Sequence, residues 1–220
     1  IVEVVTDNDV TYSFGSPALW ETVSRHCARE AIELPSLKRV FMAGAPVQPS
    51  LHRRMLMEGL LPDGADVFTP YGCTEALPVA CFRGSAVLEE TASRSLDGAG
   101  ICVGTPVGAA CVRIIRITDD PIPEWDESLI LPRGRIGEIV VRGPMVTPSY
   151  FRREEQTRLA KISDGDTIWH RIGDLGYVDD EGRLWMCGRK SHRVETTLGM
   201  MCTVPCEAIF LRHPRVYRAA

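Results

Sequence analysis

One stretch decides the fold of this chain: Ala65-Asp66-Val67-Phe68-Thr69-Pro70-Tyr71-Gly72-Cys73-Thr74-Glu75. Its apolar beginning, residues 65–68, reads as a short strand, and Pro70 with Gly72 predicts a turn directly after it. Pro78 keeps any helix that begins after the turn short. The pattern therefore predicts that the polar residues of the turn project from a loop at a strand end, which is where ligands bind in open α/β sheets.

The residue types of this turn suit a nucleotide. Tyr71 offers a flat face for stacking on a base, and Gly72 lets a ligand approach the backbone closely. Thr74 offers a hydroxyl donor to a phosphoryl oxygen, and Glu75 offers a hard oxygen ligand suited to Mg²⁺. The same residues also fit a turn in which Thr74 and Glu75 merely cap a short helix, so both interpretations stay open on this evidence.

Strands and helices alternate before this turn. Strands are predicted at 10–14, 37–42 and 65–68, and helices at 18–30 and 50–60, with Ser16 as N-cap and Pro17 as the first helical residue of the earlier helix. Such alternation predicts βαβ units and a largely parallel sheet. Gly44-Ala45-Pro46 then falls at the same sheet edge as Tyr71, either as part of a site or as an ordinary strand-to-helix connection.

From about residue 100 the pattern changes. Predicted strands at 102–104, 112–117, 136–142 and 184–187 are separated by Gly, Pro and Asp turns, which indicates an antiparallel sheet or barrel. Residues 118–135 are predicted to form a surface loop, 153–161 a helix, 164–166 a hairpin turn, and 206–211 a helix that Pro205 begins. The fold class is therefore α/β, with an antiparallel barrel-like part after a largely parallel sheet.

Two further positions suit a nucleotide. Asp174 follows Gly173 at a predicted strand end, where its carboxylate can accept hydrogen bonds from the adjacent hydroxyls of a ribose. Arg189, in Gly188-Arg189-Lys190-Ser191-His192-Arg193, can point at the same nucleotide. Alternatively, Asp174 caps a turn and the basic run is a solvated turn.

Composition narrows the function classes. The 220 residues are 45% hydrophobic and 25% charged, with a net charge of −4, which is ordinary for a globular protein. The sequence contains no basic stripe of the kind that predicts nucleic-acid binding. The 8 cysteines form no C-x-x-C pair, so we expect no structural zinc. We expect a reduced, cytoplasmic compartment. Neither a signal peptide nor a membrane span is recognisable. The chain begins without Met and ends, at 216–220, as if a strand were starting, so we expect a piece of a longer protein.

These signals stand in one order: Gly44-Ala45-Pro46, Tyr71-Gly72-Cys73-Thr74-Glu75, Gly137 to Pro144, Gly173-Asp174 and Gly188-Arg189-Lys190. Their order resembles the adenylate-forming (AMP-binding) superfamily, which includes acyl-CoA synthetases, over nearly the whole chain. Segments such as 14–19, 69–80 and 100–104 more closely resemble bacterial β-lactone synthetases of olefin biosynthesis. That resemblance implies ATP-dependent activation of a 2-alkyl-3-hydroxy fatty acid, which closes to a β-lactone with release of AMP and pyrophosphate.

The resemblance implies a role for each candidate position. Tyr71 stacks on adenine and the backbone of Gly44, Ala45 and Pro46 lines the adenine pocket, with Gly72 beside them. Thr74 holds the α-phosphate and Glu75 binds Mg²⁺, so these two are the catalytic candidates, while Asp174 and Arg189 bind the ribose. It also implies three parts: residues 1–100 in the nucleotide-binding subdomain, 101–190 in a barrel-like subdomain, and 191–220 in a hinge, at Ser191, and the start of a C-terminal lid domain.

Some features depart from the superfamily pattern. Ile172 stands where Thr is usual, and Thr196-Thr197-Leu198-Gly199 lacks the common paired glycines, which disfavours thiolation by CoA and favours lactone formation. A phosphate-binding loop with a Lys and the late catalytic Lys are not in the chain. Since charge neutralisation at phosphorus is a large part of such catalysis, we expect the 220 residues alone to be inactive in pyrophosphate exchange.

Three functions therefore remain open. The first is a β-lactone synthetase, the second is a fatty-acid–CoA ligase, and the third is a nucleotide-binding module without catalysis, against which Glu75 and Asp174 argue. The resemblance further implies a fatty-acid-type substrate and an assembly with enzymes of the same pathway.

Overall fold

The computed structural model describes residues 1–216 and 219, which divide into two compact units. The first unit comprises residues 1–71 and 81–92, and the second comprises residues 72–80 and 93–220. The boundaries fall inside β3 (Asp66–Cys73) and β4 (Ala76–Arg83), so each of these strands contributes to both units. The strand start expected at 216–220 involves residues 217, 218 and 220, which lie outside the described residues.

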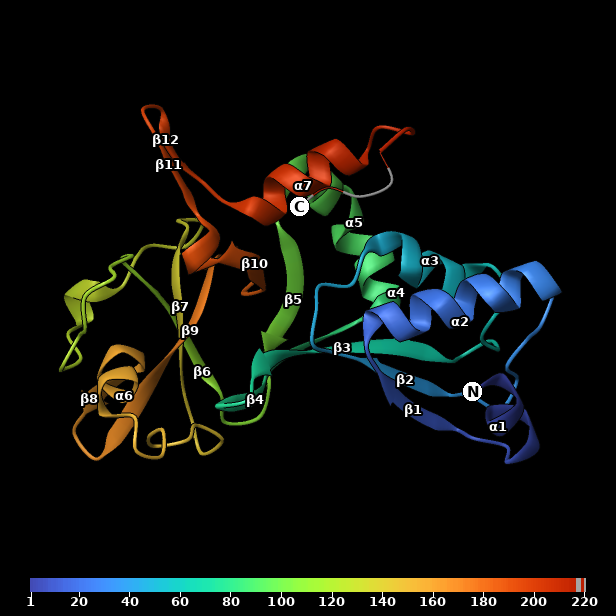
Figure 1. The fold of residues 1–220 in the computed structure, drawn as a ribbon, viewed down its shortest axis with the longest axis horizontal. Helices are drawn as coiled ribbons and strands as arrows, with labels where there is room; N and C mark the ends of the chain where they lie inside the picture. The colour runs from blue at the N-terminus through green and yellow to red at the C-terminus, as the bar shows by residue number, and fades with distance from the viewer. Residues whose placement is uncertain (217–218, 220) are drawn as a thin grey trace. The chain divides into compact units, whose positions relative to one another are not determined.

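Helices and parallel strands alternate in the first unit, as the sequence predicts (Figure 1). Before β3 the elements are α1 (Val2–Asp7), β1 (Tyr12–Gly15), α2 (Pro17–Glu30), β2 (Arg39–Met42) and α3 (Pro49–Met57). Strands β1 and β2 pair in parallel, with Phe14 opposite Phe41, and β2 pairs in parallel with β3, with Phe41 opposite Phe68. Ser16 caps α2 by accepting a hydrogen bond from the backbone N–H of Leu19 at 3.2 Å, so the predicted N-cap is confirmed.

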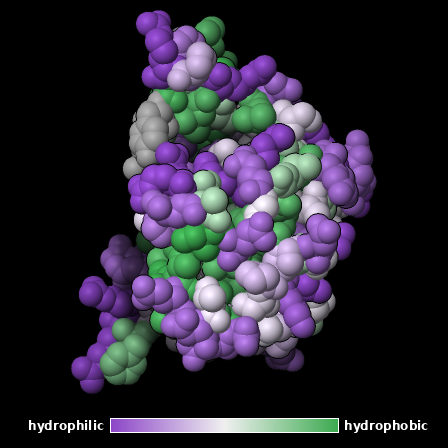
Figure 2. Space-filling model, turned by 90° about the vertical axis from the view of Figure 1, so that its right-hand side faces the viewer, coloured by the Kyte–Doolittle hydropathy of each residue, from purple (hydrophilic) through white to green (hydrophobic). Residues whose placement is uncertain are grey.

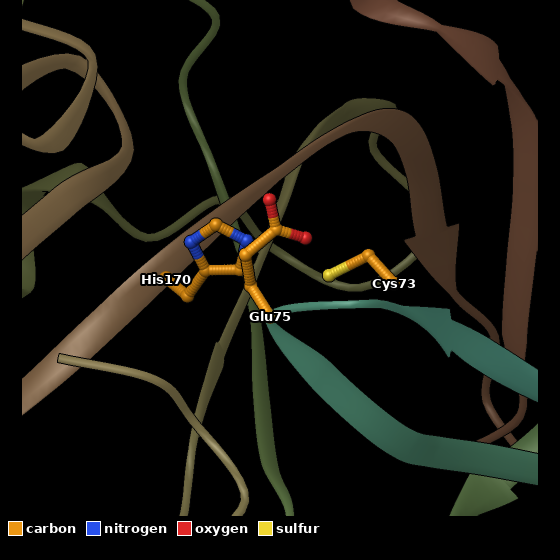
Figure 3. A group of neighbouring side chains, drawn as sticks. All are labelled: Cys73, Glu75 and His170. Carbon is orange, nitrogen blue, oxygen red and sulfur yellow. The ribbon is translucent and has the colours of Figure 1, made fainter. Parts of the chain in front are cut away.

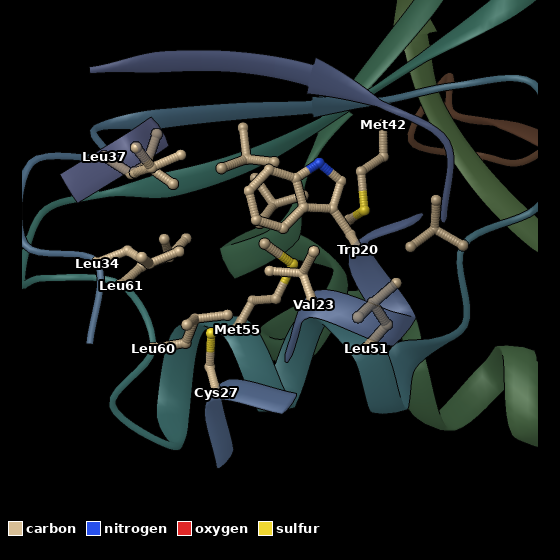
Figure 4. Packing of buried hydrophobic residues seen from close by; sticks show 14 residues of the cluster. Trp20, Val23, Cys27, Leu34, Leu37, Met42, Leu51, Met55, Leu60 and Leu61 are labelled. Carbon is tan, nitrogen blue, oxygen red and sulfur yellow. The ribbon is translucent and has the colours of Figure 1, made fainter. Parts of the chain in front are cut away.

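The core of this unit lies between the sheet and the helices on one of its faces. Figure 4 shows Trp20 and Val23 of α2 meeting Met55 of α3 below the strands, with Met42 of β2 at the side of the indole ring. Trp20 is fully buried, and an aromatic side chain of this size dominates the burial of apolar surface in a core. The apolar faces of α2 and α3 therefore hold both helices on the parallel sheet.

Strand β3 is longer than the sequence predicts. It continues through Pro70 to Cys73, so the turn expected after Phe68 is wrong. Parallel pairing with β2 ends at Phe68, and beyond that point the hydroxyl of Thr69 donates to the carbonyl of Phe82 in β4 at 3.2 Å. A proline is tolerated there because one edge of the strand needs no N–H donor.

A run of short helical segments follows β4, for which the sequence analysis predicted no helix. It consists of α4 (Gly84–Ala86), η1 (Val87–Thr91), α5 (Ala92–Arg94) and η2 (Ser95–Ala99). The carboxylate of Asp66 in β3 accepts hydrogen bonds from the backbone N–H of Ser85 at 3.1 Å and from its hydroxyl at 2.6 Å. These bonds satisfy a donor at the start of the run and fix it to the sheet.

The second unit is built on an antiparallel sheet. After η2 it contains β5 (Ile101–Pro106), β6 (Cys111–Ile115), η3 (Glu127–Leu129), β7 (Gly137–Arg142), α6 (Glu154–Ala160), β8 (Lys161–Asp164), β9 (Thr167–Val178), β10 (Leu184–Arg189), η4 (Lys190–His192), β11 (Val194–Thr196), β12 (Gly199–Met201) and α7 (Thr203–Leu211). The hydrogen-bonded order is β4-β5-β10-β9-β7-β6, with β8 also paired to β9 and β11 paired separately to β12. The predicted α/β class with an antiparallel second part is confirmed, and that part is an open sheet rather than a closed barrel among the described strands.

The start of one predicted helix and the content of one predicted loop differ in this unit. Helix α7 begins at Thr203, before Pro205, which is tolerated because the first helical turn needs no intrahelical N–H bond. The predicted surface loop at 118–135 contains η3 and buries Leu129, which is 3% exposed, in a cluster with Ile115 of β6.

The surface is mixed in polarity. On the face drawn in Figure 2, hydrophilic side chains predominate and hydrophobic ones show between them, as is normal for a globular protein. None of the helices formed by the described residues is both long enough and apolar enough to cross a membrane.

Candidate active site

Thr74 and Glu75 form the turn of the hairpin between β3 and β4. Because a strand follows this turn, the interpretation that the two residues cap a helix is wrong. A Cβ atom on Gly72 would lie 2.4 Å from the carbonyl oxygen of Ala76, so the hairpin itself requires glycine there. Thr74 is exposed and Glu75 is half-buried, which leaves a hydroxyl and a carboxylate at the tip of the hairpin.

The carboxylate of Glu75 is held by other residues of the second unit, to which residues 72–80 belong. The hydroxyl of Tyr150 donates a hydrogen bond to its Oε1 at 2.5 Å, and the backbone N–H of Thr147 donates to its backbone carbonyl at 2.8 Å. The hydrogen bond from Tyr150 lowers the pKa of Glu75, while burial acts in the opposite direction. Glu75 is therefore an oriented, ionised carboxylate at neutral pH.

Two more ligand atoms lie beside Glu75. Figure 3 shows its carboxylate between the imidazole of His170, in β9, and the sulfur of Cys73, at the end of β3. The potential ligand atoms of the three residues all lie within 4.8 Å of one another. Burial and the charge of Lys161 lower the pKa of His170 to about 4, so the imidazole is neutral, and burial with the charge of Glu75 raises the pKa of Cys73 to about 11.

Asp174 and Arg189 form a second pair in the same unit. A guanidinium nitrogen of Arg189 lies 3.0 Å from Oδ1 of Asp174, and the two residues are opposite each other in β9 and β10. Asp174 lies inside β9 and not at a strand end, so that expectation is wrong. Gly173 has a φ of +80°, and the pairing registers of β9 shift nearby, so the glycine belongs to an irregularity within the strand rather than to its end.

The remaining predicted residues lie in the first unit. The segment Gly44 to Pro46 follows β2, is exposed, and contains Gly44 at a φ of +93°. Tyr71 is half-buried in β3 beyond the register pair of Phe41 with Phe68. Because β2 and β3 are parallel, the segment and Tyr71 lie toward the same end of the sheet, as the sequence predicts.

The structure thus groups the predicted residues in three places. Gly44, Ala45, Pro46 and Tyr71 belong to the parallel sheet, Gly72, Thr74 and Glu75 to the hairpin, and Asp174 and Arg189 to the antiparallel sheet. Sequence reasoning assigned no role to Tyr150, Lys161 or His170, the neighbours of Glu75. No spacing rule connects Tyr150 or His170 with Glu75 in the sequence.

The chain belongs to the family of AMP-binding enzymes, whose model matches residues 1–151.

Individual relatives narrow the comparison. The chain is 46% identical over 99% of its length to the olefin beta-lactone synthetase of Xanthomonas campestris pv. campestris, and 45% identical over 96% to that of Stenotrophomonas maltophilia. It is 26% identical over 100% of its length to a long-chain-fatty-acid–CoA ligase of Thermus thermophilus. The chain spans 39%, 38% and 38% of the length of these three proteins, respectively.

Solved structures share the fold. The amide bond synthetase McbA of Marinactinospora thermotolerans matches with a TM-score of 0.76 at 29% identity, covering 100% of this chain and 40% of that one. The O-succinylbenzoate coenzyme A synthetase of Bacillus subtilis, solved in complex with ATP and magnesium ion, matches with a TM-score of 0.73 at 24% identity, covering 99% of this chain and 39% of that one.

Proposed function

We propose that the full-length protein is an ATP-dependent ligase that activates a fatty-acid carboxylate as an acyl-adenylate, and that it is a β-lactone synthetase. The observation that carries this proposal is the 46% identity over 99% of the chain to an olefin beta-lactone synthetase. The substrate is then a 2-alkyl-3-hydroxy fatty acid, and the products are a β-lactone, AMP and pyrophosphate.

Each candidate residue has a role in this proposal. Tyr71 stacks on adenine, and the backbone of Gly44 to Pro46, with Gly72, lines the adenine pocket. Thr74 donates its hydroxyl to the α-phosphate. The carboxylate of Asp174 accepts hydrogen bonds from the ribose hydroxyls, and Arg189 assists there and orients Asp174, from which it lies 3.0 Å away.

Glu75 suits Mg²⁺, because an ionised, half-buried carboxylate at a hairpin tip is the kind of oxygen ligand this ion takes. When bound, Mg²⁺ offsets the charge that develops on the phosphoryl oxygens. The chain's part is to hold the carboxylate in place, which the 2.5 Å hydrogen bond from Tyr150 supports.

The reaction has two steps. A carboxylate oxygen of the fatty acid attacks the α-phosphorus of ATP, and pyrophosphate leaves with the electron pair of the broken P–O bond. The oxygen of the 3-hydroxyl then attacks the acyl carbon, its proton passes to solvent, and AMP leaves.

The substrate is tested directly. Incubation of the full-length protein with ATP, Mg²⁺ and a 2-alkyl-3-hydroxy fatty acid should give a β-lactone and AMP in equal amounts, without coenzyme A. Mass spectrometry of the lipid product and chromatography of the nucleotides measure both. Turnover that requires coenzyme A and yields a thioester with no lactone would replace this function by the second candidate, a fatty-acid–CoA ligase, which the Thermus thermophilus relative favours.

The role of Asp174 is tested by Asp174→Asn. A hydrogen bond to a charged group contributes about 1.5–3 kcal/mol, so the KM for ATP should rise roughly 10- to 100-fold. The kcat should change less, since the ribose is bound equally in the ground and transition states.

Asp164→Asn is the matched control for this exchange. Asp164 also pairs with an arginine in the same sheet, at 2.5 Å from Arg142, but has no proposed nucleotide contact. Equal KM values for the two variants would remove Asp174 from the nucleotide site.

We also propose a cytoplasmic location and an assembly with enzymes of the same pathway. The third proposal is the division of the chain into residues 1–100, 101–190 and 191–220. The 8 cysteines, all among the described residues, form no disulfide, which is typical of a reducing compartment. Cell fractionation tests the location, co-purification with enzymes that consume the lactone tests the assembly, and limited proteolysis of the full-length protein tests the division.

A further inference from the structure

The donor set around Glu75 differs from the one that Mg²⁺ prefers. Alongside the carboxylate stand the sulfur of Cys73 and a ring nitrogen of His170, all within 4.8 Å of one another. Magnesium takes oxygen ligands, whereas thiolate, imidazole and carboxylate together are typical of zinc and similar transition metals. The mechanism proposed above uses neither Cys73 nor His170.

The imidazole of His170 is oriented for a metal. Its Nδ1 lies 3.1 Å from the carbonyl oxygen of Ala160. A carbonyl can only accept, so Nδ1 carries the proton and Nε2 keeps its lone pair. Metal-binding histidines are commonly fixed in this way, by a hydrogen bond from the other ring nitrogen to a carbonyl or carboxylate.

The separation of the ligand atoms is close to what such an ion needs. Zinc bonds of about 2.0–2.3 Å at tetrahedral angles place ligand atoms roughly 3.3–3.8 Å apart. The ligand atoms here lie within 4.8 Å of one another, so each pair needs to close by at most about 1.5 Å. Glu75 is half-buried at a hairpin tip and Cys73 is half-buried at the end of β3, so both side chains can make this adjustment.

The charges around the cluster are mixed. Lys161, which is 8% exposed, is a neighbouring cation and opposes a metal. The Nζ of Lys161 lies 3.4 Å from the hydroxyl oxygen of Thr147. The hydroxyl of Tyr150 is neutral, so its hydrogen bond to Glu75 adds no charge. Coordination deprotonates the thiol of Cys73, so thiolate and carboxylate together neutralise a divalent ion.

We propose that Cys73, Glu75 and His170 bind a divalent transition metal ion of the Zn²⁺ type, with an open fourth position. Three protein ligands and one open position are the pattern of zinc sites that exchange a ligand with solvent or substrate. An ion held there occupies the carboxylate assigned to Mg²⁺, so it inhibits acyl-adenylate formation. This consequence, unlike the binding itself, rests on the proposed function.

Cobalt titration of the full-length protein, without nucleotide or Mg²⁺ and in a non-thiol reductant, tests the site. One equivalent of Co²⁺ should give a thiolate-to-cobalt charge-transfer band, which Zn²⁺ then removes. Loss of an outer-shell partner typically lowers metal affinity 10- to 100-fold, so Cys73→Ser and His170→Gln, which each remove a ligand, should lower it by about 100-fold or more.

Cys81→Ser is the control, because Cys81 is another half-buried cysteine, on β4, outside the cluster. Its band and affinity should match those of the unsubstituted protein. Thermal unfolding checks that each variant is folded, and two variants on different strands keep the test valid where one does not fold. A missing band, or a band that survives Cys73→Ser in the folded variant, overturns the site.

The inhibitory consequence is measured separately. One equivalent of Zn²⁺ should abolish most ATP-dependent activation of the fatty acid, and excess chelator followed by Mg²⁺ should restore it. Metal binding without inhibition leaves the metal site standing and contradicts the role of Glu75 in Mg²⁺ binding. Inhibition without the Cys73-dependent band overturns the site while leaving the proposed function intact.

Discussion

Glu75→Gln should slow acyl-adenylate formation, the proposed activity of the full-length protein, roughly 100-fold, or ~3 kcal/mol, because it removes the charge proposed to hold Mg²⁺ at the transferring phosphoryl group. The exchange is nearly isosteric. The side-chain carbonyl of glutamine can still accept the hydrogen bond that Tyr150 donates to Oε1 of Glu75 at 2.5 Å. The expected effect therefore comes from the loss of the negative charge. For the same reason, the Mg²⁺ concentration needed for half-maximal rate should be higher in this variant.

Pyrophosphate exchange measured over a Mg²⁺ titration gives both quantities. Glu127→Gln is the matched control, since Glu127 also accepts a side-chain hydrogen bond, from Trp125 at 2.8 Å, but is exposed and outside the site. Its rate should equal that of the unsubstituted protein. An unchanged rate and an unchanged Mg²⁺ requirement in Glu75→Gln would show that the metal is held elsewhere.

The sequence predicted the parallel part of the fold well because its signals are local. Ser16 and Pro17 mark the start of α2 through one turn of backbone geometry, and the structure confirms both. The end of β3 could not be predicted in this way. Whether Pro70 breaks a strand depends on which edge of that strand is paired, and the partner, β4, follows only after the turn.

The site was predicted as a set of residue types rather than as an arrangement. Glu75 and Asp174 stood out because each carboxylate follows a glycine within three residues, which is a signal that can be seen in a short stretch of sequence. Their neighbours were not predictable, since His170 lies in β9 and Tyr150 lies between β7 and α6, both far from Glu75 in the sequence. The same holds for Asp174, whose pairing with Arg189 follows from the register of β9 and β10.

The contacts of Arg171 are the clearest example of an arrangement that the sequence could not predict. Its five N–H groups are all used: two guanidinium nitrogens donate to the carboxylate of Glu138 in β7, at 3.1 and 2.7 Å, and the others to the carbonyls of Thr118, Asp120 and Leu159. The side chains of Arg171 and Glu138 are 2% and 1% exposed. No local pattern distinguishes this arginine from a solvated one, and residues 118–120 were predicted to belong to a surface loop.

Arg171→Met should therefore lower the free energy of unfolding by about 3–5 kcal/mol, because it leaves the buried carboxylate of Glu138 without its main partner. Lys190, 3.1 Å from Glu138, remains as a partial partner. The double variant Arg171→Met, Glu138→Leu should recover part of the loss, since replacing both members of a buried pair by apolar residues is often close to neutral. Denaturant unfolding of the full-length protein, followed by tryptophan fluorescence, measures these differences.

Arg212→Met provides the contrast that makes the result interpretable. Arg212 lies 2.6 Å from Asp97, but the two side chains are 58% and 65% exposed, so removing this pair should cost no more than about 1 kcal/mol. If Arg171→Met and Arg212→Met unfold at the same denaturant concentration, the free energy of unfolding depends no more on the buried ion pair than on the exposed one. The loop that supplies the carbonyls of Thr118 and Asp120 would then be held by the packing of Leu129, and not by the guanidinium.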